Sequence, residues 1–187
     1  MFILKFLQKI KSFFYKNFIS VNKPICGKKV RIKQPTLFMG KGKIILHDRV
    51  QIGYFPSAQF FSSDSFIEAM FSNSKIEIGK NTIINNSCTI VTDMVDIEIG
   101  ENCKIGTNFK CYSSDFHGLK VEDRENLDKV MAKSVKIGNN VFIGDNVIIL
   151  KGVTIADGSV IGAGSVVTKS FNEENTILAG NPARKIK

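Results

Sequence analysis

The chain has 187 residues, enough for one domain with a sizeable core, and its 43% hydrophobic and 23% charged residues are ordinary for a globular protein. This composition argues against a disordered chain, and four cysteines without C-x-x-C spacing agree with a reducing compartment. The net charge of +9 is uneven, since residues 1–47 hold eleven Lys or Arg and no acidic residue.

Residues 1–24 are predicted to form a basic amphipathic helix, because apolar side chains recur at helical spacing among lysines. Such a helix can lie on an anionic membrane surface, or it can pack on its own domain or on a partner subunit. Lys5, Lys9 and Lys11 break the apolar run, so the segment is neither a spanning helix nor a signal peptide. We therefore expect a cytoplasmic protein that can contact the inner face of the membrane.

Residues 25–74 carry the first, irregular copies of a repeat. The run K-I-I-L-H-D-R-V-Q-I-G at Lys43–Gly53 is a weak version of K-I-E-I-G-K-N at Lys75–Asn81, which returns as D-I-E-I-G-E-N at Asp96–Asn102. Coiling is therefore expected from about residue 25. The stretch Tyr54–Phe71 holds five phenylalanines and no repeat, and we interpret it as subunit or core packing rather than as a substrate platform.

A period of six residues becomes regular from Ile137 to Thr168, where Ile143, Ile149 and Ile155 begin successive hexads. An amphipathic helix repeats its apolar positions every 3.6 residues, so this period predicts a β-solenoid. Three hexads make one coil of three strands, in which the aliphatic side chain points inward and Gly or Asn takes the tight corner. Several coils must stack to bury a continuous core.

The repeat fails over residues 113–134, and we expect an excursion loop at residues 117–134. An excursion from a rigid, regular stack is where function tends to be placed. His117 stands at its start beside Asp115, whose carboxylate can set the tautomer of the imidazole. A lone histidine is often only a structural polar residue, but in this position it is a candidate general base that removes a proton from a hydroxyl or amine.

The end of the chain resembles a known family. It reads I-G-N-N-V-F-I-G-D-N-V-I-I-L-K-G-V-T-I-A-D-G-S-V-I-G-A-G-S-V-V-T-K and then A-G-N-P-A-R-K-I-K. This run is similar to the hexapeptide-repeat acetyltransferases, above all the galactoside, maltose and polysaccharide O-acetyltransferases. The resemblance covers residues 75–187 well. It implies an all-β fold, a left-handed parallel β-helix over residues 25–187, with a CoA-binding tail at 179–187. It also implies a homotrimer that binds acetyl-CoA in grooves between subunits.

The resemblance also assigns roles to single residues. His117 matches the catalytic base and Asn85 an asparagine near the acetyl-transfer site, while Asp93 matches a carboxylate that contacts the acceptor, and we group Asp115 with it. The residues that match contacts to CoA are Phe142, Gly144, Ala163, Thr168, Lys169, Arg184 and Lys187. Phe142 stands where many members have a tryptophan, so its stacking on CoA is expected to be weaker. The C-terminal cations suit nucleotide phosphates, although they can also form a solvated basic tail.

We therefore expect an acetyl-CoA-dependent O-acetyltransferase that modifies a sugar hydroxyl, with His117 as general base, in a bacterial surface polysaccharide pathway such as capsule or lipopolysaccharide. N-acetylation of an amino sugar, free or nucleotide-linked, stays open because the same histidine can deprotonate an amine. A non-catalytic β-helix scaffold is the alternative of another class, and it would not bind CoA.

Metal and cysteine chemistry are not expected. The zinc-dependent carbonic anhydrase built on this kind of coil needs three histidine ligands, whereas this chain has only His47 and His117. Cys88, Cys103 and Cys111 fall on small or inward positions of the hexad frame. They are therefore predicted to be buried small hydrophobes rather than nucleophiles or ligands.

Overall fold

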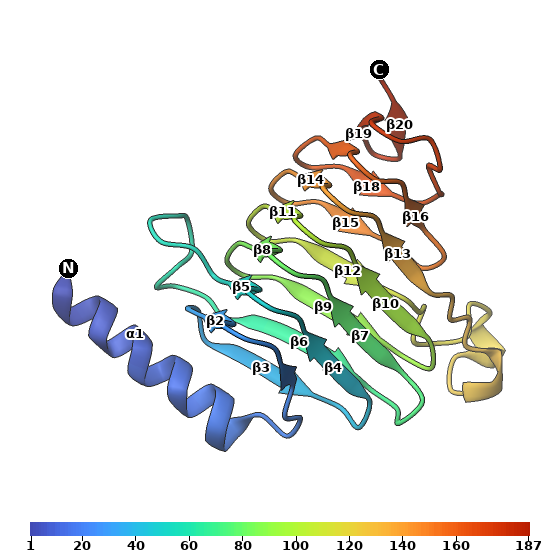
Figure 1. Cartoon of the computed structure of the whole chain (residues 1–187). Helices are drawn as coiled ribbons and strands as arrows, with labels where there is room; N and C mark the ends of the chain where they lie inside the picture. Colours follow the sequence, from blue (N-terminus) through green and yellow to red (C-terminus); the bar gives the residue numbers. More distant parts are fainter.

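Three parallel sheets form the three sides of an elongated coil, described over residues 1–187 by a computed structural model (Figure 1). Sheet A contains β1 (Ile25–Cys26), β4 (Lys43–Leu46), β7 (Lys75–Ile78), β10 (Asp96–Ile99), β13 (Val135–Ile137) and β16 (Thr154–Ile155). Sheet B contains β2 (Arg31–Ile32), β5 (Gln51–Ile52), β8 (Ile83–Ile84), β11 (Lys104–Ile105), β14 (Phe142–Ile143), β17 (Val160–Ile161), β19 (Ile177–Gly180) and β20 (Ala183–Lys185). Sheet C contains β3 (Thr36–Met39), β6 (Ser65–Ala69), β9 (Thr89–Thr92), β12 (Lys110–Tyr112), β15 (Ile148–Ile149) and β18 (Val166–Val167). The chain visits A, B and C in turn, so successive coils stack along the molecule.

Equivalent residues of successive coils are in register, so similar side chains stack on one another. Ile84, Ile105, Ile143 and Ile161 lie one above the other in sheet B with their side chains buried inside the coil. All strand pairs are parallel except the terminal hairpin of β19 and β20. The inward side chains of all three sheets form one continuous hydrophobic cluster. The parallel β-helix predicted from the hexads is confirmed, and its first strand begins at Ile25.

The corners between sheets use the residue types that the repeat predicts. Asn81, Asn102 and Asn140 have φ of 60°, 58° and 56°, a left-handed conformation that asparagine tolerates better than most residues. Each of these asparagines is the third residue after a sheet A strand, within the turn into sheet B. The hexad therefore encodes both the inward side chain and the turn.

The stretch Tyr54–Phe71 is more regular than its sequence indicates. Its second half contains β6, which continues sheet C between β3 and β9 although no hexad marks it in the sequence. The inward positions of β6 include Ser65 and Ala69 in place of the usual aliphatic residues, and this hides the pattern. Only residues 54–64 leave the coil.

The insertion at residues 54–64 is tied to the coil above it. The side-chain amide of Asn86 donates to the carbonyl oxygens of Tyr54 at 3.1 Å and Ala58 at 2.8 Å. Within the insertion, Phe55 and Phe60 pack edge to face, with ring centroids 5.4 Å apart. The insertion is thus an ordered platform beside the first coils.

The N-terminal segment is a helix, α1 (Phe2–Phe14), followed by a π turn, η1 (Tyr15–Ile19), and it lies beside the first coil (Figure 1). Its two buried side chains are polar. Gln8 donates to the carbonyl oxygen of Phe60, and the hydroxyl of Ser12 donates to the carbonyl oxygen of Lys33 at 3.5 Å. The apolar residues of α1 are exposed. No helix in the structure combines the length and apolar character that crossing a bilayer requires.

Shortening one core side chain should measure how tightly the coil is packed. Ile143→Val removes one methylene group from a fully buried position in β14, so we expect it to lower the free energy of unfolding by about 0.5–1.5 kcal/mol. Urea denaturation followed by circular dichroism would measure the change. The same substitution at the exposed Ile186 is the matched control and should have almost no effect. Equal effects at both positions would contradict the tightly packed core.

Candidate active site

The residues predicted to form the site divide between two corners of the coil. Asp93, Asp115 and His117 follow β9 and β12, so they lie where the chain passes from sheet C to sheet A, the C-to-A corner. Asn85 follows β8 and therefore lies where sheet B passes to sheet C, the B-to-C corner. Gly144 follows β14 at this second corner. Within one chain, Asn85 and His117 therefore lie at different corners of the coil.

The CoA-binding residues predicted from the resemblance show the same division. Phe142 is on β14, Ala163 follows β17 near the B-to-C corner, and Arg184 is on β20, which extends sheet B. Thr168 and Lys169 follow β18 and belong to the C-to-A corner. The structure thus brings Asn85 near Phe142 and Gly144, and it places His117 on the edge shared with Asp93 and Asp115.

The excursion fills the whole interval in which the repeat fails, because β12 ends at Tyr112 and β13 starts at Val135. It therefore spans residues 113–134 rather than 117–134. It contains two short 3-10 helices, η2 (Val121–Asp123) and η3 (Leu127–Lys129), and projects from one side of the coil (Figure 1). Gly118 permits a close crossing inside it, since a Cβ at this position would lie 2.3 Å from the carbonyl oxygen of Asp123. This crossing holds the segment that carries His117.

The ring of His117 is oriented by the excursion itself. Its Nδ1 lies 3.2 Å from the carbonyl oxygen of Arg124, and the rest of the imidazole is exposed. A carbonyl oxygen can only accept a hydrogen bond, so Nδ1 must carry the proton in this contact. The neutral ring then keeps an unprotonated Nε2 with a free lone pair. This is the tautomer that a general base requires.

The prediction that Asp115 sets this tautomer is wrong. Phe116, which separates the two residues, has a φ of 61° and turns the chain between them. Asp115 instead accepts from the ammonium group of Lys151 at 2.5 Å, and its second carboxylate oxygen is buried without a hydrogen-bond partner. Sequence reasoning also missed Lys151 and the carbonyl of Arg124. Neither carries a local signal, because both contacts depend on how the excursion folds back.

Asp93 lies at the base of the excursion and is 4% exposed. Its carboxylate accepts from the hydroxyl of Ser114 at 2.8 Å, and its backbone N–H donates to the hydroxyl of Ser113 at 3.1 Å. These bonds join the coil below the excursion to the residues that lead into His117. In a single chain, Asp93 therefore supports the start of the excursion.

A pocket of about 450 Å³ lies on the outer face of sheet B, beside Asn85. Gly106 and Gly144 are in register with Asn85 in the next two coils of sheet B, and neither has a side chain to fill the pocket there. A Cβ at Gly144 would lie 2.6 Å from the backbone nitrogen of Ala163, so this close stacking requires glycine. The half-exposed ring of Phe142 lines the same pocket.

The side chain of Asn85 is held in one orientation. Its oxygen accepts the backbone N–H of Asn86 at 2.8 Å, and its amide donates to the hydroxyl of Ser57 at 3.0 Å. An asparagine amide has two N–H donors, so one remains for a ligand in the pocket. The insertion at residues 54–64 thus fixes the direction of this donor.

Comparison with known proteins relates the hexapeptide repeat and the coil to acetyltransferases. The model of the bacterial transferase hexapeptide (six repeats) matches residues 134–169. The structure of the polySia-specific acetyltransferase NeuO is 29% identical, covers 87% of this chain and 80% of that chain, and gives a TM-score of 0.63. A galactoside acetyltransferase in complex with coenzyme A is 27% identical, with 99% and 80% coverage and a TM-score of 0.61. A maltose O-acetyltransferase from Clostridium difficile 630 is 26% identical, with 100% and 86% coverage and a TM-score of 0.56.

The chain contains the hexapeptide repeat, and its likeness to these enzymes supports an acyltransferase. Its fold is the left-handed parallel β-helix that the resemblance implied. This acyltransferase keeps an imidazole with a free lone pair at one corner and a pocket with an oriented amide at another. The first group can accept a proton from a nucleophile, and the second can donate to an oxygen on which charge develops.

Three of the four cysteines of the acyltransferase are poor candidates for a covalent acyl intermediate because they are buried. Cys88, Cys103 and Cys111 are buried, as predicted from the hexad frame. Burial raises the pKa of the Cys88 thiol to about 11, and it also raises the pKa values of Cys103 and Cys111. The reactive form of cysteine is the thiolate, which these shifts disfavour. Direct transfer from the donor to the acceptor therefore fits the site better.

The C-terminal end of the acyltransferase presents cations without acidic partners. Arg184 is on β20 and is exposed, as is Lys187, and neither forms an ion pair. Lys185 pairs with Glu173 at 2.7 Å, so it is less available. Thr168 and Lys169 are also exposed, one coil below. These groups can meet an anionic ligand at this end of the coil.

Proposed function

We propose that the protein is an acetyl-CoA-dependent O-acetyltransferase that acts on a sugar hydroxyl, with His117 as the general base. The observation that carries this proposal is the hydrogen bond between Nδ1 of His117 and the carbonyl oxygen of Arg124, which leaves Nε2 free to accept a proton. The similarity to sugar and polysialic acid acetyltransferases supports this choice of donor and acceptor.

In the proposed reaction, Nε2 of His117 takes the proton of the acceptor hydroxyl while the hydroxyl oxygen attacks the thioester carbonyl. The remaining N–H of Asn85 donates to the oxyanion of the tetrahedral intermediate. The C–S bond then breaks, and the CoA sulfur leaves with the proton from the imidazolium. Holding donor and acceptor side by side supplies much of the rate enhancement, and proton transfer to His117 contributes roughly 10² to 10⁴-fold.

We further propose that the active unit is a homotrimer and that each site takes residues from two copies. The separation of Asn85 and His117 on two corners supports this arrangement, because one chain cannot place both at one reacting carbonyl. The excursion adds support, since it exposes Leu119, Val121 and Leu127 to solvent in a single chain. Apolar side chains at the tip of a projecting segment suit contact with a neighbouring copy.

Acetyl-CoA is proposed to bind along the groove that begins at the pocket of Phe142 and leads toward the C-terminal cations. Gly144 and Ala163 leave room for a narrow chain beside the coil, and Arg184 can meet a nucleotide phosphate. Lys187 is assigned to the same ligand, and so are Thr168 and Lys169 of the neighbouring copy, since they lie at the C-to-A corner. Asp93 and Asp115, at the opposite corner, are assigned to the acceptor.

Removing the ring of Phe142 tests the donor side of this groove. The half-exposed ring is proposed to pack against the CoA arm, so Phe142→Ala should raise the Kd for acetyl-CoA about fivefold, the equivalent of about 1 kcal/mol. Isothermal titration calorimetry would measure the change. Phe18→Ala removes another exposed ring far along the chain and should leave the Kd unchanged. An unchanged Kd for Phe142→Ala would place the CoA arm elsewhere.

The acceptor is proposed to be a sugar in a bacterial surface polysaccharide pathway, modified in the cytoplasm at the inner face of the membrane. Thiol release from acetyl-CoA, measured against sugars, nucleotide sugars, oligosaccharides and amino sugars, tests this function. Turnover with a hydroxyl acceptor supports O-acetylation, whereas turnover only with amines would establish N-acetylation instead. A protein that neither binds acetyl-CoA nor releases thiol would be a scaffold, and the proposal would fail.

A further inference from the structure

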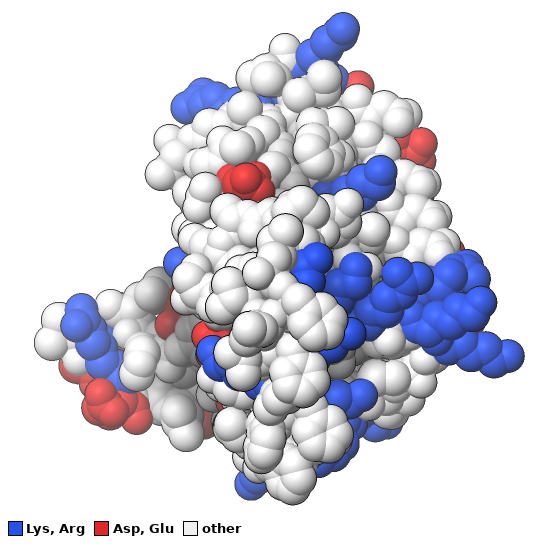
Figure 2. Space-filling model, turned by 90° about the vertical axis from the view of Figure 1, so that its left-hand side faces the viewer, with Lys and Arg blue, Asp and Glu red and all other residues white.

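Helix α1 turns its polar residues toward the domain and its apolar residues toward solvent, the reverse of the usual orientation. A helix that packs on its own domain normally turns its apolar stripe toward the core. In α1 the polar Gln8 and Ser12 face inward, whereas Phe2 is 84% exposed, Phe6 56% and Phe13 58%. Figure 2, which looks onto this side of the molecule, shows ring-bearing uncharged side chains at the lower centre with lysine and arginine side chains beside them. The apolar face of α1 therefore has no partner within the chain.

The outward face of α1 is broad and continuous with the turn that follows. Its exposed apolar side chains are Met1, Phe2, Ile3, Leu4, Phe6, Leu7, Ile10, Phe13, Phe14, Phe18 and Ile19. Three of these rings contact one another, since Phe13 and Phe14 each lie close to Phe18, with centroids 6.0 Å and 5.3 Å away. Monomeric proteins rarely leave an apolar patch of this extent in water, so the patch indicates a binding surface.

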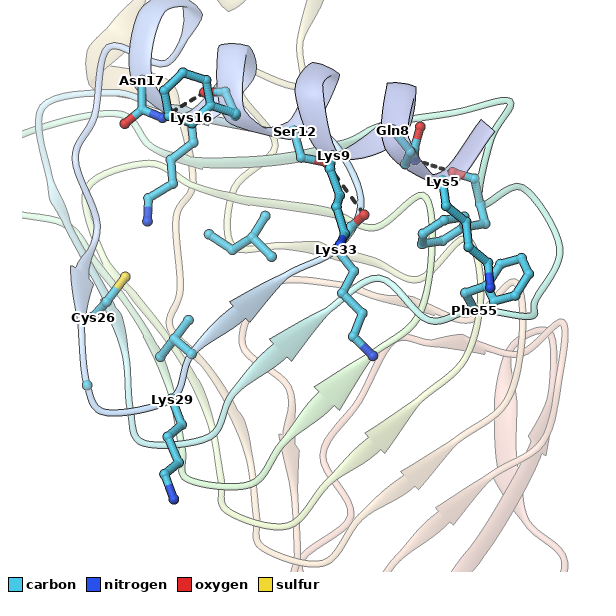
Figure 3. A pocket seen from close by; sticks show the side chains of 15 residues that line it. Lys5, Gln8, Lys9, Ser12, Lys16, Asn17, Cys26, Lys29, Lys33 and Phe55 are labelled. Carbon is cyan, nitrogen blue, oxygen red and sulfur yellow. Dashed lines mark hydrogen bonds between the residues drawn. The ribbon is translucent and has the colours of Figure 1, made fainter. Parts of the chain in front are cut away.

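Cations border the apolar face and line a groove next to it. The groove, of about 820 Å³, lies between α1 and the first coil. Its lysines come from both sides, as Figure 3 shows, and are Lys5, Lys9, Lys16, Lys29 and Lys33. No acidic residue lines the groove, and none of these lysines forms an ion pair. The surface is therefore apolar and strongly positive at once.

The exposed apolar face and the positive groove together determine what kind of partner can bind this surface. A second copy of α1 would satisfy the apolar face, but it would bring its own lysines against this groove, and no acidic residue is present in residues 1–47 to compensate. An anionic bilayer satisfies both properties, since its acyl region accepts the rings and its phosphates accept the ammonium groups. A helix of 13 residues is about 20 Å long and can lie in the plane of the interface.

We propose that α1 docks the enzyme on an anionic lipid bilayer. Its outward apolar face enters the boundary between headgroups and acyl chains, and the lysine groove receives lipid phosphates. Gln8 keeps the helix attached to the insertion, and Ser12 keeps it attached to Lys33, the residue after β2, while the opposite face is in lipid. The surface is formed by residues other than those assigned to acetyl transfer, so docking does not depend on the proposed reaction.

Co-sedimentation of the full-length protein with vesicles tests this proposal. Vesicles of phosphatidylcholine with about 30 mol% phosphatidylglycerol should bind the wild type. Vesicles of pure phosphatidylcholine should bind it at least about tenfold more weakly. Lys5→Gln/Lys9→Gln/Lys16→Gln should weaken binding to the anionic vesicles by about a hundredfold, since each lysine near the surface contributes about a factor of five. Phe6→Ser/Phe13→Ser should weaken binding to a similar extent.

The triple variant Lys120→Gln/Lys129→Gln/Lys136→Gln is the matched control, because it removes the same charge from exposed lysines distant from α1. It should bind the anionic vesicles within about twofold of the wild type. Light scattering after size exclusion should show the same oligomeric state for every variant. If Phe6→Ser/Phe13→Ser dissociates the oligomer, or if the control loses vesicle binding to the same extent as the α1 lysine variant, the proposal is overturned.

Discussion

His117→Ala is expected to lower kcat for acetyl transfer by about 10² to 10⁴-fold while leaving the Kd for acetyl-CoA within about twofold of the wild type. The imidazole is exposed, and its one hydrogen bond goes to the carbonyl oxygen of Arg124, so its removal leaves no buried group unsatisfied and should not disturb the coil. The loss should appear in kcat because proton transfer to His117 is proposed to occur only during attack on the thioester. Thiol release with saturating acetyl-CoA measures kcat, and calorimetry measures the Kd.

His47→Ala is the matched control for this experiment. His47 is the other histidine of the chain and directly follows β4 of sheet A, and its Nε2 is 2.7 Å from a carboxylate oxygen of Glu77. It touches neither corner that carries site residues, so its removal should leave kcat unchanged. If His117→Ala retains more than about a tenth of the wild-type kcat, proton removal by this imidazole is not the main contribution.

The coil could be predicted from the sequence because each hexad encodes it locally. Ile143 and its equivalents point inward, and the asparagines at the corners take the left-handed turn, so six residues are enough to specify one side of the coil. Where inward residues are small, as in β6 with Ser65 and Ala69, the same geometry forms without the sequence signal. Neighbouring coils then supply the register.

The contacts of the site could be predicted only in part, because they depend on chain reversals that a repeat does not encode. His117 was found from the break in the repeat, but its partner is a backbone carbonyl seven residues away rather than the nearby Asp115. The positive φ of Phe116 decides this, and a phenylalanine gives no warning of it. The direction of α1 was also undetermined, since an amphipathic pattern does not say which face meets the domain.

Replacing Asn85, which lies at a different corner from His117, is expected to have the second large effect on kcat. Asn85→Asp should lower kcat by about 10² to 10³-fold, because it replaces the N–H that is proposed to stabilise the oxyanion with a negative charge. The aspartate can still accept the backbone N–H of Asn86, and the hydroxyl of Ser57 can donate to it, so the local fold is preserved. Asn86→Asp is not a suitable control, since Asn86 is buried and holds the insertion.

Co-expression of the His117→Ala and Asn85→Asp chains should restore activity that neither variant has alone. In a trimer whose sites each take His117 from one copy and Asn85 from its neighbour, equal random mixing leaves about one site in four with both residues intact. Mixed trimers purified through two different affinity tags should then recover on the order of a quarter to a third of the wild-type kcat. Mixing the two variants after separate assembly is the control and should restore nothing.

Recovery in the mixed trimers would require a site shared between copies, since every chain in them lacks one of the two residues. No recovery would mean that Asn85 and His117 act from the same chain or that one of them does not act in transfer. The geometry favours recovery. Asn85 is fixed at the B-to-C corner by Ser57 and Asn86, and His117 is fixed beyond the C-to-A corner by Arg124, so neither side chain is free to cross sheet C to reach the other.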